Sequence, residues 1–128
     1  MGAPLKVLRL FVDSSGVSRF DGGEIARELR EFAPPAAPLY ASSVEAATGF
    51  AVLRLPVGWY GEKHPSPKRQ ILFCLAGAAR VVPDVGDPRV VAAGEAWLME
   101  DTHGAGHTTE VISDVPFDAV VVQLPETG

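Results

Sequence analysis

Short apolar stretches separated by Gly, Pro or Asp follow one another from residue 49 onward. They are rich in β-branched and aromatic residues, which favours strands over helices. The predicted strands are FAVLRLPV, RQILFCLAG, ARVVP, PRVVAAG, EAWLMED, TTEVIS and FDAVVVQL. PDVGDP, at 83–88, joins two of them and carries the Gly and Asp residues typical of a hairpin loop. The pattern predicts an all-β, antiparallel fold.

Several of the predicted strands are apolar on both faces. Ile71 and Phe73 alternate with Leu72 and Cys74, and the same pattern recurs at 119–124. Such strands need cover on both sides. A barrel or a two-sheet sandwich supplies the inner cover, whereas a partner subunit or an N-terminal arm supplies the outer one. We therefore expect a homodimer.

The segment DGGEIARELREFAPP, at 21–35, permits two interpretations. Asp21 is a suitable N-cap, and Ile25, Leu29 and Phe32 have helical spacing before a Pro-Pro stop, which favours a short helix. Two glycines in the first turn weaken that helix. The alternative is an extended segment along a sheet edge, with Ile25 and Leu29 docked.

The proline-rich FAPPAAPL that follows cannot form an interior strand, because proline donates no backbone hydrogen bond. We therefore expect residues 1–48 to form an arm, either extended or with a short helix, that packs on a barrel core of residues 49–125. A chain of 128 residues with 47% hydrophobic content favours one domain overall, 1–128.

Charge and cysteine content limit the partners. The net charge is -5 and no run of Lys or Arg could follow a phosphate backbone, so we expect no nucleic-acid partner. Cys74 is the single cysteine, which excludes an intrachain disulfide and suits a reducing cytoplasm. The N-terminal LKVLRLFV is interrupted by Lys6 and Arg9 and is too short to span a bilayer. We expect a cytoplasmic protein without membrane contact.

The three histidines fall in two short segments, each at the boundary of a predicted strand. His64 lies in EKHPSPKRQ, whereas His103 and His107 lie in EDTHGAGH. Loops beside a rigid scaffold often carry functional groups. Because imidazole titrates near neutral pH, His64 and His107 are candidates for a general acid and base acting on a small molecule.

The spacing G-x5-H-x-S-x3-Q-x6-G over residues 58–77 resembles the first motif of the cupin superfamily. AAGEAWLMEDTHGAGH resembles the second motif, with Gly94 as the turn glycine and His107 as the histidine. HPSPKRQ and EDTHGAGH together resemble a group of small single-domain bacterial cupins, and the likeness is strongest over 52–124. The resemblance implies a double-stranded β-helix, or jelly-roll barrel, that holds a small organic molecule.

The resemblance also implies a site of three histidines and one carboxylate, at the positions of His64, Ser66, Gln70 and His107. Two of these four are changed, since Ser is a poor ligand for a divalent ion and Gln offers a neutral oxygen. We therefore expect no tightly bound metal and predict no other cofactor. A divalent metal (Zn, Fe, Mn or Ni) held weakly by His64, Gln70 and His107 is the alternative. His103 could supply a further ligand or lie in solvent.

Several neighbouring side chains are candidates for supporting roles. Gln70 could orient His64 or bind a substrate carbonyl. Glu100 and Asp101 could orient His107 or share its proton transfer, and Asp101 is also a candidate for substrate contact. Alternatively, these two acids are solvated at a strand end.

Three further residues could bind substrate. Arg69 could contact a substrate carboxylate or pair with Glu62 at the surface. Trp59 and Tyr60 could line a pocket for an apolar ligand or cap the core.

Three functions remain open, and the sequence does not decide whether the chain is an enzyme. The first is a cupin enzyme that performs histidine-mediated proton transfer, of isomerase, cyclase or lyase type, with His64, His107, Gln70 and Glu100 as its catalytic groups. The second is a metal-dependent dioxygenase or hydrolase with the reduced ligand set. The third is a non-catalytic protein that binds or senses a small molecule. The first is our leading prediction.

Overall fold

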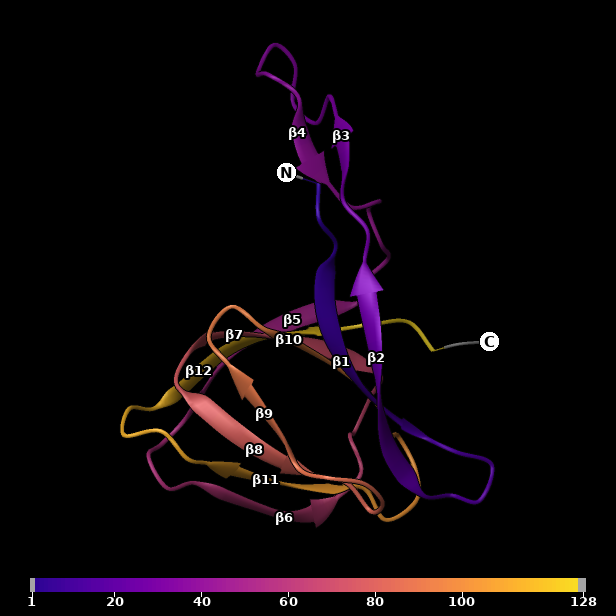
Figure 1. Cartoon of the computed structure of the whole chain (residues 1–128), viewed down its shortest axis with the longest axis vertical. Coiled ribbons are helices and arrows are strands. Elements are labelled where there is room, and N and C mark those ends of the chain that lie inside the picture. The colour runs from indigo at the N-terminus through magenta and orange to yellow at the C-terminus, as the bar shows by residue number, and fades with distance from the viewer. Residues whose placement is uncertain (1, 127–128) are drawn as a thin grey trace.

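The computed structural model describes residues 2–126, and their regular structure consists of strands alone. The larger sheet has the order β2 (Ser18–Ile25), β1 (Leu5–Val12), β10 (Ala96–Glu100), β7 (Gln70–Ala76), β12 (Phe117–Gln123) and β5 (Gly49–Leu55). The second sheet has the order β6 (Tyr60–His64), β11 (His107–Val111), β8 (Ala78–Val82) and β9 (Arg89–Ala92). A small hairpin of β3 (Glu28–Arg30) and β4 (Leu39–Ala41) projects from this body (Figure 1). The all-β prediction is confirmed.

One hydrophobic core lies between the two larger sheets. Leu10, Trp97 and Phe117 enter it from the six-stranded sheet, and Val81 and Val111 from the four-stranded sheet. Within residues 2–126, no strand of the six-stranded sheet pairs with a strand of the four-stranded sheet. The two sheets therefore form a sandwich and not a closed barrel. The Cys74 thiol is free and buried, and this burial raises its pKa.

The pairing is antiparallel except at one place. The hairpin loop expected at 83–88 joins β8 and β9, which pair as predicted. β1, however, pairs parallel to β10, with Val7 opposite Ala96. Parallel neighbours need a long crossover, and the chain between β1 and β10 passes through most of the molecule.

Residues 21–25 belong to β2, so the extended alternative for this segment is correct and the helix is wrong. Ile25 lies opposite Leu5 in the β1–β2 ladder and packs against the cluster of Val7, Ile71 and Ala96. The expected docking of Leu29 is wrong, because 60% of this residue is exposed on the projecting hairpin. Pairing with β1 satisfies the backbone here, whereas a helix would begin with two glycines.

The outer face of the six-stranded sheet is also apolar. Val120 and Val122 of β12 lie opposite Val52 and Phe50 of β5, on the face away from the main core. Val52 and Phe50 are 69% and 75% exposed. Across residues 2–126 we find no helix that is long and apolar enough to cross a membrane.

Glu100 of β10 binds two arginines on this outer face, Arg9 of β1 and Arg69, which directly precedes β7. Arg9 Nε donates to Glu100 Oε1 at 2.5 Å, and Arg69 Nε donates to Glu100 Oε2 at 2.6 Å. Partial burial by itself raises the pKa of Glu100, but the hydrogen bonds from Arg69 and Arg9 outweigh it and lower the pKa below its ordinary value. The ionised carboxylate therefore stabilises the folded sheet.

Replacing Gly77 tests the tight packing of the turn between β7 and β8. Gly77 has a φ of 79°, and an added Cβ would lie 2.5 Å from the Pro116 carbonyl oxygen. Gly86 is the matched control, because its φ is 103° but a Cβ there meets no atom within 4 Å. Left-handed backbone should cost either alanine variant about 1–2 kcal/mol. Gly77→Ala should lose more than Gly86→Ala in urea unfolding, and equal losses would contradict the packing argument.

Replacing Glu100 should make unfolding less sensitive to acid. Because its pKa is lower in the folded than in the unfolded chain, the carboxylate stabilises the fold above about pH 4.3, and this contribution disappears as the pH falls through the folded value. Glu100→Gln should therefore lose about 1–2 kcal/mol at pH 7 and almost nothing at the acid limit of folding. The control, Glu110→Gln, breaks an exposed pair with Arg80 and should change stability little. A loss in Glu100→Gln that is independent of pH would overturn this account.

Candidate functional site

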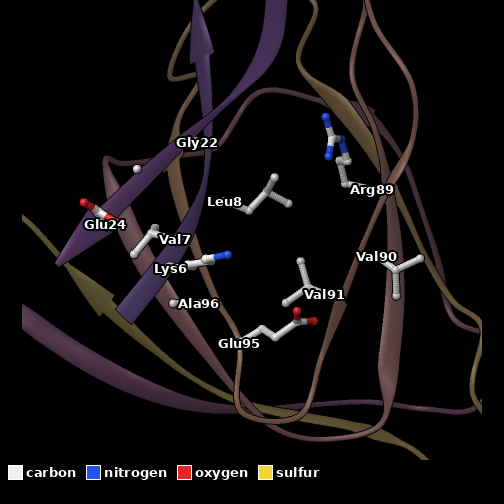
Figure 2. A pocket seen from close by; sticks show the side chains of 11 residues that line it. Lys6, Val7, Leu8, Gly22, Glu24, Arg89, Val90, Val91, Glu95 and Ala96 are labelled. Carbon is white, nitrogen blue, oxygen red and sulfur yellow. The ribbon is translucent and has the colours of Figure 1, made fainter. Parts of the chain in front are cut away.

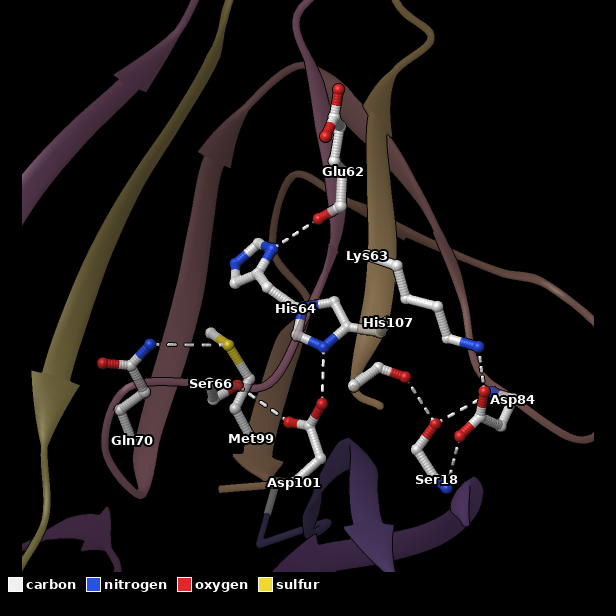
Figure 3. Close-up of polar contacts among 11 residues, drawn as sticks. Ser18, Glu62, Lys63, His64, Ser66, Gln70, Asp84, Met99, Asp101 and His107 are labelled. Atoms are coloured by element: carbon white, nitrogen blue, oxygen red, sulfur yellow. Dashed lines mark hydrogen bonds and ion pairs between the residues drawn. The ribbon is translucent and has the colours of Figure 1, made fainter. Parts of the chain in front are cut away.

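His107 forms a buried pair with Asp101. Asp101 follows the end of β10, and His107 begins β11. The Asp101 side chain is completely buried, and 4% of the His107 side chain is exposed. His107 Nδ1 lies 2.5 Å from Asp101 Oδ2 (Figure 3). The carboxylate therefore orients the ring and holds a proton on Nδ1, which leaves Nε2 as the reactive atom.

Ser66 supports the same carboxylate from the segment between β6 and β7. Its Oγ donates to Asp101 Oδ1 at 2.8 Å, and its backbone N–H donates to the Asp101 carbonyl at 2.9 Å. Both carboxylate oxygens of Asp101 are thus bound. The residue that occupies a metal-ligand position in the cupin motif here points its hydroxyl at Asp101 instead.

His64 lies beside His107 but is exposed at the end of β6. The two residues are register partners, and their ring centroids are 5.4 Å apart. The Nδ1 of His64 lies 2.5 Å from the carbonyl oxygen of Glu62. A carbonyl only accepts, so this Nδ1 carries the hydrogen and the Nε2 of His64 keeps its lone pair. Each histidine therefore presents an unprotonated Nε2 when neutral.

The loop before His107 is held by close backbone contacts. Gly106 has a φ of 83°, and an added Cβ would overlap the backbone of His64. Ser18 of β2, which is 1% exposed, donates its Oγ to the Gly106 carbonyl at 2.7 Å. Gly106 thus allows the loop to pass against the end of β6, where His107 lies beside His64.

Gln70 and Trp97 complete the surroundings. Gln70 Nε2 lies 3.5 Å from the Met99 sulfur, and Figure 3 places both side chains to one side of the histidine rings. The expected bond from Gln70 to His64 is therefore replaced by the Glu62 carbonyl. Trp97 meets His107 edge to face at 5.3 Å. Among residues 2–126, Trp97 Nε1 is the buried side-chain nitrogen or oxygen that has no partner.

Glu100 and Arg69 do not reach the histidines. Along β10, Trp97 and Met99 enter the main core, whereas Leu98 packs against the outer cluster. Side chains alternate along a strand, so Glu100 also faces outward, where it pairs with Arg69. The structure therefore does not bring Glu100, the expected catalytic residue, or Arg69, the expected substrate contact, to the two histidines.

The remaining candidates also have new positions. Asp101, expected to contact substrate or to orient His107, is buried beside His107, and this geometry supports the orienting role. Trp59 packs against the core and over Gly61, whereas Tyr60 is 56% exposed. His103 is exposed in its loop.

The residues of this site do not form the set of metal ligands that the cupin resemblance implies. No group of three or more His, Cys, Asp or Glu side chains converges on a metal position in the described part of the chain. Two imidazole nitrogens are present, but Ser66 is bound to Asp101 and the Gln70 amide rests on a sulfur. A structural or catalytic metal ordinarily needs at least three protein ligands. The residues around His64 and His107 therefore supply two of the ligands that such a metal needs.

Neither the family models nor the curated proteins match this chain. Solved structures do. A Cupin 2 conserved barrel domain protein from Salinispora arenicola is 18% identical, with 79% of this chain and 76% of that chain covered and a TM-score of 0.52. The Cnp3 cupin domain of Schizosaccharomyces pombe is 11% identical, with 95% and 88% covered and a TM-score of 0.50.

The DMSP lyase DddQ from Ruegeria pomeroyi is 28% identical over 72% of this chain, with a TM-score of 0.51. The match spans 44% of the lyase, which is less than half of its length. The motif spacing agrees with three findings. These are the two-sheet architecture, the adjacent positions of His64 and His107, and the similarity to these solved structures. The chain therefore has the cupin fold.

Proposed function

We propose that this chain is a small cupin enzyme that binds a small organic molecule beside His64 and His107 and transfers protons through them. The observation that carries the proposal is the 2.5 Å pair of His107 Nδ1 and Asp101 Oδ2, which leaves Nε2 free next to a second histidine. A histidine oriented by a buried carboxylate is a well-suited general base.

His107 is the proposed base. Its Nε2 removes a proton from a substrate carbon that is acidified by a neighbouring carbonyl or carboxylate. The imidazolium that results is stabilised by the Asp101 carboxylate, which is already held by Ser66 and needs no rearrangement. Because Asp101 has no solvent contact, this attraction is weakly screened.

His64 is the proposed acid. It is exposed, so it can exchange protons with water, and its Nδ1–H keeps the Glu62 carbonyl bond in either protonation state. In an elimination, the electrons of the broken C–H bond form a C=C bond and the leaving group departs with the electrons of its own bond. A leaving group that departs as an anion takes the Nε2 proton of His64, which His64 regains from water, whereas the sulfonium group of DMSP departs as a neutral sulfide and takes none. His107 releases its proton to water.

Elimination is our preferred member of the isomerase, cyclase and lyase classes. The support is the likeness to DddQ, which is named a DMSP lyase. DMSP and small carboxylates with a leaving group at the β-carbon are therefore the first substrates to assay. The choice of lyase class depends on this likeness, whereas the proton transfer depends on the histidine geometry.

Variants of the dyad should separate the two roles. With a substrate found in that panel, His107→Gln and Asp101→Asn should each reduce kcat by about 10²–10⁴-fold, because both remove the oriented base. His64→Gln should reduce kcat less, and hardly at all for DMSP, whose leaving group takes no proton. Product formation followed by NMR measures all three effects.

Glu100→Gln is the matched control, because Glu100 faces the other side of β10 and should leave kcat within about twofold. Turnover should also resist a chelator and be unaffected by added Zn, Fe, Mn or Ni. Turnover that requires one of these ions would favour the metal-dependent alternative. A ligand that binds tightly and is released unchanged would favour the non-catalytic alternative.

We also propose a homodimer, in a cytoplasmic setting that suits the free thiol of Cys74. The exposed apolar pairs of β5 and β12 form one outer surface, and a two-fold axis would bury it on both subunits. Light scattering should give about twice the mass of one 13.5 kDa chain. Val52→Asp should halve that mass, whereas Val44→Asp, at an exposed position outside the sheets, should not. A monomeric wild type would refute the dimer.

A further inference from the structure

A cavity of about 660 Å³ lies between the β1–β2 edge of one sheet and β9 of the other. Its walls include Lys6, Leu8 and Gly22 on one side and Arg89, Val91 and Glu95 on the other (Figure 2). A volume of roughly 300–1,000 Å³ is typical of sites for small organic ligands. Size alone does not make a site, so the argument depends on what lines the cavity.

The cavity is separate from the histidine site, and the two share no lining residue. Leu8 lies at the cavity, and Leu10, the next residue on the same face of β1, is fully buried. Trp97, opposite Leu8 in the β1–β10 ladder, is 3% exposed. The packed core around Leu10 and Trp97 therefore stands between the cavity and His107.

Gly22 leaves one wall of the cavity without a side chain. It lies inside β2 opposite Leu8, and its φ is outside the left-handed region. An added Cβ would meet no atom within 4 Å. The fold itself therefore does not require glycine here, and glycine weakens a strand interior. Because Gly22 has no side chain, the space over Leu8 is open. Glycine is often found in a strand where a ligand approaches the backbone closely.

The charges around the cavity favour an anion. Lys6 and Arg89 approach from opposite walls, and neither forms an ion pair within residues 2–126. Glu95, by contrast, accepts the backbone N–H of Ala92 at 2.7 Å and closes the β9–β10 turn. Glu24, opposite Lys6 in the ladder, also forms no ion pair within residues 2–126 and is exposed, as Lys6 and Arg89 are. Two unpaired cations and one unpaired carboxylate leave one positive charge over, which suits one negative charge better than several.

We propose that this cavity binds a small monocarboxylate with a short branched hydrocarbon body. The carboxylate lies between Lys6 and Arg89, and the hydrocarbon body covers Leu8 and Val91 beneath the bare edge at Gly22. Leu8 and Val91 both pack on the main core, so they offer the apolar floor that such a body needs. The site is distinct from the proposed catalytic site, so each proposal can be correct without the other.

Titration with 4-methylpentanoate, followed by amide NMR of the whole chain, tests the proposal. Saturable shifts should appear at Leu8, Gly22 and Val91, while the amides of His64 and His107 stay in place. Lys6→Met and Arg89→Met should each weaken binding roughly tenfold, and the control Lys68→Met should not. Shifts confined to the two histidines would overturn the cavity site, although they would support the catalytic one.

A pair of glycine variants supplies the sharpest control. Gly22→Val should block the cavity and abolish binding. Gly49→Val adds the same side chain on β5, the other edge strand of this sheet, where a Cβ meets only Gln123 Oε1 at 4.0 Å, and should bind normally. Equal binding by the two folded variants would overturn the proposal. So would binding of 3-methylbutylamine, inorganic phosphate or L-leucine as tight as that of the carboxylate.

Discussion

The buried carboxylate of Asp101 is the constraint on which the candidate site depends. A carboxylate without solvent contact costs several kcal/mol unless hydrogen bonds or an opposite charge compensate for it. Here Ser66 and His107 each bind one of its oxygens. These two residues come from the segment before β7 and from the start of β11. One buried charge therefore determines how three separate parts of the chain meet.

The N-terminal strands support this arrangement from the other side. β1 pairs with β10, at whose end Asp101 lies, and Ser18 of β2 holds the carbonyl of Gly106 in the loop before His107. The same two strands supply Lys6 and Gly22 to the cavity. Because β1 and β2 belong to the main sheet, both candidate sites depend on a segment that carries no histidine.

The sequence predicted the strands well, because an apolar run bounded by Gly, Pro or Asp can be recognised locally. The resemblance to the two cupin motifs also implied that His64 and His107 lie together. The sequence missed the Ser66–Asp101 bond, since nothing local links residues 35 positions apart. The sequence alone also gave no reason to prefer Asp101 over Glu100 as the residue that orients His107. Neighbouring residues on a strand point to opposite faces, so only one of the two could reach His107.

The sequence by itself determined the strand class, the alternation of side chains and the two histidine segments. Only the tertiary structure decided which face of each strand is interior, because a shift of one residue in register exchanges the faces. It also decided between helix and strand at 21–25, where long-range pairing with β1 outweighs a weak local preference. Finally, it reassigned Ser66 from a changed ligand position to the support of a buried charge, since hydrogen-bond partners depend on spatial proximity.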